Sequence, residues 1–246
     1  MPDPTVPYCG PIPLPETLWR SWNLEPVLLA CLVALAVAGG LALWQARAQA
    51  HRHGAFALAA GGAFLAFVTP LCALTVALFA ARSLHHLLVI GLIAPALAWA
   101  MPLRRVPTGA AFLVLSAALW AWHVPGVYSA AWDSAQVYWM MQAALLLPGW
   151  AFWSGVIRAR GQAMASLGAA GMVAGLAGQM GLIGAILTFA PRPLYGEHLV
   201  GAEAFGLSLL GDQQLAGLIM WVPGMLPLAI VGALLLHRSW RQGLAA

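Results

Sequence analysis

The sequence predicts an all-α polytopic membrane protein that forms a bundle of seven transmembrane helices. Two observations lead to this prediction: 62% of the 246 residues are hydrophobic, and only 7% are charged. Soluble globular domains carry about 25% charged residues, so this chain has too few to cover a water-facing surface. Its apolar residues run for about twenty positions at a time, whereas a transmembrane β-barrel alternates them with polar ones. The composition therefore excludes a soluble enzyme, a nucleic-acid-binding domain and a disordered protein.

Seven apolar runs are long enough to cross a hydrocarbon layer about 30 Å thick, which needs about 20 helical residues. The fourth run is the shortest, and it reaches membrane length only if it continues to a break at His123 and Pro125. The runs are residues 26–46, 55–78, 84–101, 110–124, 135–156, 163–189 and 213–236.

The charged residues predict the orientation of the bundle. All 11 basic residues are arginines, and eight of them follow the first, third, fifth and seventh runs: Arg47, Arg52, Arg104, Arg105, Arg158, Arg160, Arg238 and Arg241. The positive-inside rule assigns this side to the cytoplasm. The seven acidic residues all lie on the other side: Asp3, Glu16, Glu25, Asp133, Glu197, Glu203 and Asp212. We therefore expect the N-terminus outside and the C-terminus in the cytoplasm.

The chain is expected to form one transmembrane domain, residues 25–246, preceded by an external arm, residues 1–24. The arm carries six prolines and no basic segment ahead of Glu16, so it does not resemble a signal peptide. The three cysteines are an odd number at unrelated spacings, and they predict no disulfide framework.

Two histidines are expected at matched depth near the external boundary, His86 at the start of the third run and His123 at the end of the fourth. Histidine is the commonest metal ligand and a usual haem ligand. Sulfur-containing side chains are expected at a similar depth: Cys72, Met140, Met141, Met180 and Met220. A set of His, Met and Cys suits Cu(I) better than Mg²⁺, Ca²⁺ or Mn²⁺.

These residue types also have plainer interpretations. Methionines in apolar helices mostly serve packing, and a single interfacial histidine is more often hydrogen-bonded than bound to a metal. No HxxxH, MxxM or CxC pattern sharpens the metal interpretation. The glycines of the sixth run recur every three or four residues, and we expect them to pack against other helices of the bundle.

Polar residues near the last two helices predict a pocket at the external side. Arg192 lies against the cytoplasmic bias of the other arginines, so it should pair with Asp212 or Glu197, or bind a carboxylate of a partner or substrate. Asp212 is also placed to cap the seventh helix. Gln213 and Gln214 enter the bilayer and should face the bundle interior or water. We expect helices three, four, five and seven to line this pocket.

Catalytic patterns are not found in the sequence. It contains no nucleophile–base pairing, no phosphate-binding loop and no pair of carboxylates within a span. An enzyme is therefore not expected.

Several motifs resemble the CtaG family of cytochrome c oxidase assembly factors, of the caa3 type. The most specific is DQQLAGLIMWVPG at residues 212–224, which includes Trp221. Similar segments are LTFAPRPLY at 187–195, HVPGVYSAA from His123, VTPL at 68–71 and HLLVIGLIAPAL at 86–97. The resemblance covers roughly residues 19–240. It implies a seven-helix protein of the bacterial inner (plasma) membrane that helps to mature a haem–copper oxidase, with copper handling.

The sequence departs from the family pattern at several potential ligands. The family opens its third helix with two histidines four residues apart, but here the first position is Arg82 and only His86 is kept. The other departures are Cys72, Ser83, His85, Tyr138, Met141 and Gln142. A copper site is therefore either rebuilt around other residues or lost.

The leading hypothesis is an assembly factor that binds copper, as Cu(I), or holds an oxidase subunit at the periplasmic face. Its partners would be cytochrome c oxidase subunits and periplasmic copper chaperones. The expected ligands are His86 and His123, with weaker contributions from His85, Met141 and Cys72. The expected pocket residues are Arg192, Asp212, Gln213 and Trp221. The alternatives are a b-type haem protein with His86 and His123 as axial ligands, and a metal-free scaffold or accessory subunit of the oxidase.

Overall fold

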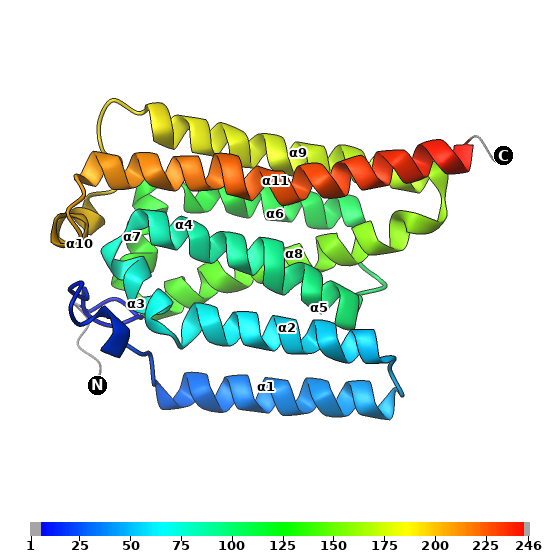
Figure 1. Cartoon of the computed structure of the whole chain (residues 1–246), viewed down its shortest axis with the longest axis horizontal. Helices are drawn as coiled ribbons and strands as arrows, with labels where there is room; N and C mark the ends of the chain where they lie inside the picture. Colours follow the sequence, from blue (N-terminus) through cyan, green and yellow to red (C-terminus); the bar gives the residue numbers. More distant parts are fainter. Residues whose placement is uncertain (1–5, 244–246) are drawn as a thin grey trace.

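The computed structural model describes residues 6–243, apart from the side chain of Arg160. Of the expected external arm, residues 1–5 and with them Asp3 lie outside this part, as do residues 244–246. Helix accounts for 81% of the structure, and no strand occurs among the described residues. The long helices lie roughly parallel and form one bundle (Figure 1).

The helices follow one another in chain order, with short helical turns between them. They are α1 (Pro26–Gln45), α2 (Ala50–Phe67), α3 (Pro70–Ala77), α4 (Phe79–Leu88), the π-helix η2 (Val89–Ile93), α5 (Ala94–Ala100), α6 (Thr108–Trp122), α7 (Pro125–Asp133), α8 (Ala135–Arg158), α9 (Ala163–Phe189), α10 (Leu199–Ala204) and α11 (Leu209–Gly243). The 3-10 turns are η1 (Leu18–Arg20), η3 (Ala159–Gly161) and η4 (Gly196–His198).

Five helical segments among the described residues are long and apolar enough to cross a membrane without a break. Two bent pairs, α2 with α3 and α6 with α7, pass the same test together, so the number reaches seven if each pair is one span. The chain is thus an all-helical multi-pass membrane protein. The unbroken segments are Pro26–Gln45, Phe79–Ala100, Ala135–Arg158, Ala163–Phe189 and Leu209–Gly243.

The second span is not the continuous helix that the sequence predicts. α2 ends at Phe67, and α3 begins at Pro70 after a bend of 48°. Proline lacks the amide hydrogen that would continue α2, and it forces the preceding Thr69 into an extended conformation, with ψ at 170°. The expected break at His123 and Pro125 is present, with an angle of 83° between α6 and α7.

The third span contains a π-helical segment, η2, between α4 and α5. The indole Nε1 of Trp153 on α8 donates a hydrogen bond of 2.8 Å to the carbonyl oxygen of Ile90. Single π turns inside α-helices are rare and often lie near functional sites.

The tight contact between α9 and α11 uses glycines from both helices, which lie side by side (Figure 1). A Cβ atom at Gly184 would be 2.7 Å from the carbonyl oxygen of Gly217, so only glycine permits this approach. The expected packing role of the glycine stripe is confirmed here. By contrast, a Cβ at Gly171 would meet no atom within 4 Å.

The N-terminal arm is attached to the bundle by a disulfide between Cys9 and Cys72. The prediction that the cysteines form no disulfide is therefore wrong. Tyr8 stacks on Tyr138 of α8, with ring centroids 4.9 Å apart, and Cys9 itself is buried. The disulfide thus fixes the arm over α3 and α8.

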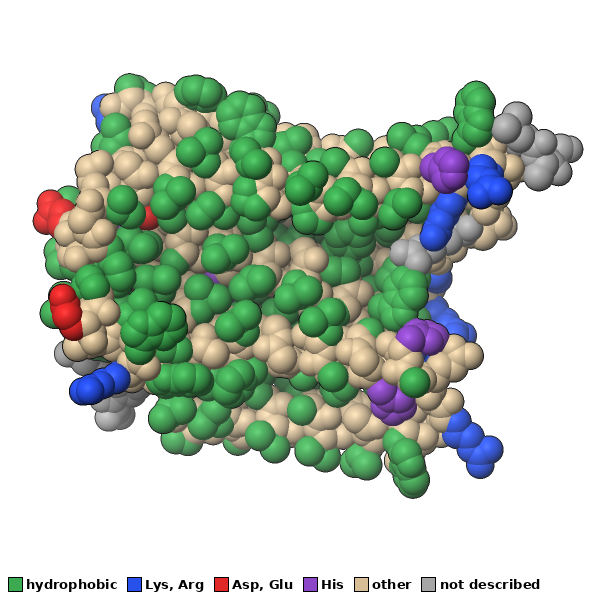
Figure 2. Space-filling model, in the orientation of Figure 1, with side chains coloured by type: hydrophobic (Ala, Val, Ile, Leu, Met, Phe, Trp, Pro, Cys, Tyr) green, Lys and Arg blue, Asp and Glu red, His purple; other side chains and the backbone are tan. Residues whose placement is uncertain are grey.

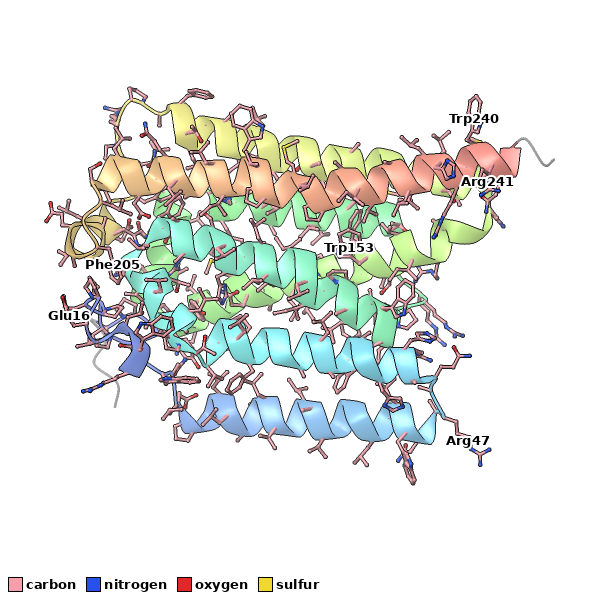
Figure 3. All side chains as sticks on the ribbon, viewed as in Figure 1. Glu16, Arg47, Trp153, Phe205, Trp240 and Arg241 are labelled. Carbon is pink, nitrogen blue, oxygen red and sulfur yellow. A yellow bond between two sulfur atoms is a disulfide. The ribbon has the colours of Figure 1, made fainter. Side chains whose placement is uncertain are left out.

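Acidic side chains lie at one end of the long axis of the bundle, whereas basic side chains gather at the other end and are also seen at the first (Figure 2). We name the two ends by their charged side chains. The acidic end is the one where α1 and α8 begin, and its loops and helix ends hold Glu16, Glu25, Asp133, Glu197 and Glu203. The basic end is the one where α1 and α8 end, and it holds Arg47, Arg52, Arg104, Arg105, Arg158, Arg238 and Arg241. Figure 3 places Glu16 at one end and Arg47 and Arg241 at the other.

Candidate metal site

The N-terminus of α4 is fixed by a carboxylate from α11. Asp212 is fully buried, and its two oxygens accept hydrogen bonds from the amide groups of Phe79 (2.7 Å) and Ala80 (3.0 Å). The expectation that Asp212 caps its own helix is wrong, because α11 begins earlier, at Leu209. A negative charge at this position also stabilises the positive end of the α4 dipole. The contact sets the position of the histidines two turns along α4.

A small cavity of about 10 Å³ brings His86 and His123 together. Four different parts of the bundle contribute its walls: α4 with η2, the end of α6, α9 and α11. The lining residues are Ser83, His86, Leu87, Ile90, Leu119, His123, Met180 and Met220. About 10–15 Å³ is what one water molecule needs, so the space suits a single small ion.

Each of these two histidines has one ring nitrogen that is not held by a hydrogen bond to another described residue. His123 Nδ1 lies 2.7 Å from the carbonyl oxygen of Leu119, so this nitrogen carries the proton and donates it. That assignment leaves His123 Nε2 as the acceptor or ligand atom. His86 Nε2 is buried and has no hydrogen-bond partner among residues 6–243. A backbone carbonyl that orients one ring nitrogen is the usual outer support of a metal-bound histidine.

The backbone at His123 is itself held in place. The hydroxyl of Tyr195 donates a 2.7 Å hydrogen bond to the carbonyl oxygen of His123. Tyr195 stacks on Phe79 with ring centroids 4.3 Å apart. Burial, with the nearby charge of Glu197, raises the pKa of the Tyr195 phenol, so this hydroxyl remains a donor.

Three of the predicted ligands do not line the cavity. His85 is fully buried against the ring of Phe67, with centroids 5.0 Å apart. Met141 is also fully buried, away from the cavity walls. Cys72 is in the disulfide with Cys9, so it has no thiolate to offer in this structure. The sulfur atoms at the cavity instead belong to Met180 and Met220. The sixth span, α9, therefore lines the cavity where the fifth span, α8, was expected to do so.

The predicted pocket residues serve the structure around the site. Gln213 is buried, accepts a 2.6 Å hydrogen bond from the Leu194 amide and donates to the carbonyl oxygen of Leu187. It therefore ties α9 to the loop that follows it. Trp221 is 38% exposed and packs against Phe189, outside the cavity lining.

Arg192 does not form the predicted ion pair. The Asp212 carboxylate is occupied at the start of α4, and Glu197 accepts a hydrogen bond from Ser129. Arg192 is exposed at the acidic end.

A second polar cluster near α4 was not predicted. Arg82 is 3% exposed, and its guanidinium carbon lies 5.2 Å from the ring centroid of Tyr128 and 5.7 Å from that of Trp132. His198 is fully buried beside them, 2.6 Å from the Tyr128 hydroxyl and 3.2 Å from the Val76 carbonyl oxygen. The sequence places His198 in a loop, and nothing in its spacing shows that the loop folds inward.

The surroundings of His198 keep its imidazole neutral. Burial, together with the positive charge of Arg82, lowers the pKa of His198 to about 3. Both ring nitrogens are already in hydrogen bonds, so His198 has no free lone pair for a metal.

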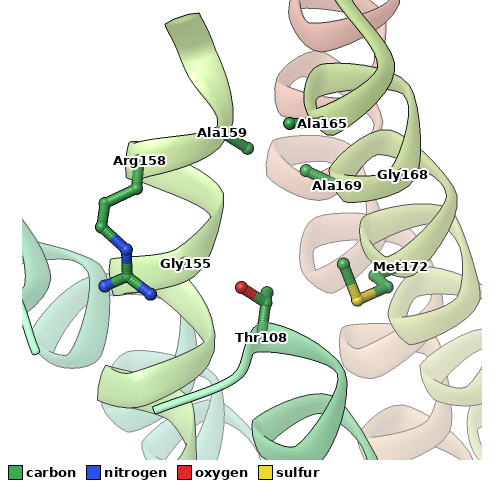
Figure 4. Close-up of a pocket in the computed structure, with 8 residues that line it drawn as sticks. All are labelled: Thr108, Gly155, Arg158, Ala159, Ala165, Gly168, Ala169 and Met172. Atoms are coloured by element: carbon green, nitrogen blue, oxygen red, sulfur yellow. The ribbon is translucent and has the colours of Figure 1, made fainter. Parts of the chain in front are cut away.

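A larger cavity of about 400 Å³ lies at the basic end between α6, α8 and α9 (Figure 4). Small side chains form most of its wall, including Gly155, Ala165 and Ala169. The guanidinium of Arg158 donates hydrogen bonds to the carbonyl oxygens of Leu103 and Val106. These bonds hold the loop between α5 and α6 against α8. This cavity has no histidine and is not the candidate metal site.

No three His, Cys, Asp or Glu side chains in the described chain come close enough together to hold a metal ion. A metal at the small cavity would therefore depend on thioethers as well as imidazoles. Thioether and imidazole together are ligands that favour Cu(I) over hard cations.

Comparison with known proteins adds one finding. A family model described as cytochrome c oxidase caa3 assembly factor matches residues 29–242. No curated protein and no solved structure matches the chain significantly.

Proposed function

The chain belongs to the family of cytochrome c oxidase caa3 assembly factors, and we propose that it handles Cu(I) for the oxidase at the acidic end of the bundle. The observation that supports this most is the small cavity where His86, His123, Met180 and Met220 meet. Assembly of the oxidase implies contact with its subunits in the membrane. The same family membership supports a non-catalytic role.

The side chains at the cavity fit copper as a cargo. His123 offers Nε2 because Nδ1 is held by the Leu119 carbonyl oxygen, and His86 Nε2 has no other partner among the described residues. Met180 and Met220 add thioethers, which bind Cu(I) without carrying a charge into the bilayer. Neutral ligands suit an ion that must be released again to another protein.

The size of the cavity argues against haem between the same histidines. A macrocycle needs far more room than about 10 Å³, and α4 and α6 would have to separate to admit it. A metal-free scaffold remains the competing hypothesis, and the experiment below distinguishes the two.

The distribution of arginines supports a cytoplasmic basic end and a periplasmic acidic end in the bacterial plasma membrane. In this orientation the copper cavity lies on the side where periplasmic copper chaperones could supply it.

The experiment is to measure copper content and absorption spectrum of the detergent-purified protein after loading with Cu(I) and ascorbate, with haem supplied separately. We expect about one copper per chain and no Soret band. His86→Ala and His123→Ala should each weaken Cu(I) binding at least tenfold, because each removes one ligand nitrogen. His237→Ala, which removes an exposed histidine at the basic end, is the matched control and should bind normally.

Copper bound equally by all four proteins would refute the proposed site. A wild-type protein that binds no copper but co-purifies with oxidase subunits would favour the metal-free scaffold.

A further inference from the structure

The cavity of about 400 Å³ at the basic end is large enough for part of a lipid molecule, because small-molecule sites occupy about 300–1,000 Å³. α9 leaves the space open: a Cβ at Gly168 would meet no atom within 4 Å. Two turns further along α9, a Cβ at Gly175 would be 3.2 Å from the ring of Phe112, so α6 and α9 are in contact there. We call this space the basic cavity. It is lined by Thr108, Gly155, Arg158, Ala159, Ala165, Gly168, Ala169 and Met172.

Two polar side chains of the basic cavity have hydrogen-bonding groups that other residues do not use. A guanidinium has five N–H groups, and that of Arg158 donates to two described carbonyl oxygens, those of Leu103 and Val106. The hydroxyl of Thr108 makes no hydrogen bond to a described residue. In Figure 4 both side chains lie on the α6 and α8 side of the cavity, and α9 forms the opposite wall. A ligand at this edge therefore meets hydrogen-bond donors.

The positive charge around the basic cavity has no acidic partner at the same end of the described chain. Arg158 bonds the carbonyl groups on either side of Arg104 and Arg105, so it holds this exposed pair of arginines near the cavity edge. The described acidic side chains all lie at the acidic end. Three arginines without a carboxylate favour an anionic ligand, and basic pockets between transmembrane helices suit the phosphate head groups of lipids.

From these observations we propose that the basic cavity binds an anionic phospholipid. Its phosphate accepts hydrogen bonds from Arg158 and Thr108, and Arg104 and Arg105 add electrostatic attraction. The first part of one acyl chain lies against the small and apolar side chains of α9 at residues 165–172. This stretch covers about 10 Å of the helix axis, at 1.5 Å per residue. A free phosphate ion would leave that apolar wall uncovered, which favours a lipid as the source of the phosphate. The inference is independent of copper and of the proposed function.

The test measures binding of four probes to the delipidated full-length protein in a non-ionic detergent. The probes are dioleoyl phosphatidylglycerol, dioleoyl phosphatidylcholine, dioleoylglycerol and inorganic phosphate. We expect about one phosphatidylglycerol per chain. Dioleoylglycerol lacks the phosphate and should bind at least about tenfold more weakly, because the hydrogen bonds to a charged group are lost. The choline cation should weaken phosphatidylcholine about fivefold. Inorganic phosphate has no chain to bury, so it should bind at least about tenfold more weakly than phosphatidylglycerol.

Two substitutions test the recognition of the phosphate. Thr108→Val keeps the shape of the side chain but removes the hydroxyl, so affinity for phosphatidylglycerol should fall about tenfold and affinity for dioleoylglycerol should stay unchanged. Arg158→Gln should lower affinity for phosphatidylglycerol at least about tenfold for the same reason. Arg47→Gln is the matched control, because Arg47 is an exposed arginine of the same end outside the cavity lining (Figure 3). This control should bind all four probes as the wild type does.

A third substitution tests the place of the acyl chain. Gly168→Leu fills the basic cavity and leaves its charges intact, so it should weaken both phospholipids by a similar factor of at least about tenfold. Gly171→Leu is the matched control on the same helix: a Cβ there also meets no atom within 4 Å, and Gly171 does not line the cavity. This pair tests the proposal even if Arg158→Gln fails to fold.

The proposal is overturned if the wild type binds phosphatidylglycerol and dioleoylglycerol equally, or if Gly168→Leu binds phosphatidylglycerol as well as Gly171→Leu does. Inorganic phosphate that binds as tightly as phosphatidylglycerol would identify a free anion as the ligand and would likewise overturn the lipid.

Discussion

Two polar regions lie within one helical turn of each other along α4, and they use histidine in opposite ways. At the cavity, His86 Nε2 has no hydrogen-bond partner among the described residues. His123 Nδ1 donates to a backbone carbonyl oxygen, which leaves Nε2 of that ring as the acceptor. In the Arg82 cluster, both nitrogens of His198 are in hydrogen bonds, and a guanidinium lies nearby. The difference shows that the state of the lone pairs, rather than depth in the membrane, separates a candidate ligand from a structural histidine.

The largest effect is expected from removing the structural histidine. Because the pKa of His198 falls to about 3 on folding, the unfolded chain binds one more proton than the folded chain between pH 6.5 and about 3. Stability contributed by His198 is therefore present above pH 6.5 and is lost as the pH falls, at up to about 1.4 kcal/mol per pH unit. His198→Gln should flatten this dependence of the thermal unfolding midpoint.

A fall in the midpoint with the same slope in the wild type and in His198→Gln would show that His198 is not held neutral. The cavity histidines are left unchanged in both proteins, so the comparison concerns His198 alone.

The next largest effect concerns the anchor that both regions share. Asp212→Asn replaces a carboxylate that accepts from two amide groups at the start of α4. Hydrogen bonds to charged groups contribute about 1.5–3 kcal/mol, so the free energy of unfolding should fall by about 2 kcal/mol. Glu203→Gln, at an exposed acid of the same end, is the control and should leave thermal stability unchanged. Equal stabilities of the two variants would contradict the anchoring role.

Substitution of a thioether sharpens the contrast between binding and structure. Met180→Leu keeps the volume and the apolar character but removes the sulfur, so the unfolding free energy should change by less than about 1.5 kcal/mol. Affinity for Cu(I), measured by competition with a chromogenic chelator, should fall by about tenfold. Met164→Leu, at an exposed methionine of α9 far from the cavity, is the matched control. Unchanged affinity in Met180→Leu would remove the thioether from the proposed ligands.

The smallest effect is expected at Arg192. This side chain is exposed and forms no ion pair with either of its predicted carboxylate partners, so Arg192→Gln should change stability by no more than about 0.5 kcal/mol. A thermal shift comparable to that of Asp212→Asn would show that Arg192 has a structural partner after all.

Most of the fold could be predicted because the apolar composition and the length of the apolar runs indicate a membrane environment. Long apolar runs place the helices, and proline chemistry explains the bends at Pro70 and Pro125. Contacts between segments that are distant in the sequence could not be predicted in the same way. The Cys9–Cys72 disulfide spans 63 positions, and the carboxylate of Asp212, in the first turn of α11, binds the start of a different helix, α4.

The candidate site was predicted in part for the same reason. Matched depth was enough to bring His86 and His123 to one cavity, and Met180 and Met220 were at the right depth as well. Depth does not specify which face of a helix a side chain occupies. His85 and Met141 have suitable depths but are buried elsewhere, and only the rotation and packing of α4 and α8 decide that.

The most direct test of the copper cavity is X-ray absorption at the copper edge of the Cu(I)-loaded wild type and of the double variant Met180→Leu/Met220→Leu. The wild type should show a mixed shell of nitrogen and sulfur neighbours. The double variant should keep the nitrogen shell and lose the sulfur contribution. A wild-type spectrum without sulfur, or a sulfur shell that survives the double substitution, would contradict a site built from His86, His123 and the two thioethers.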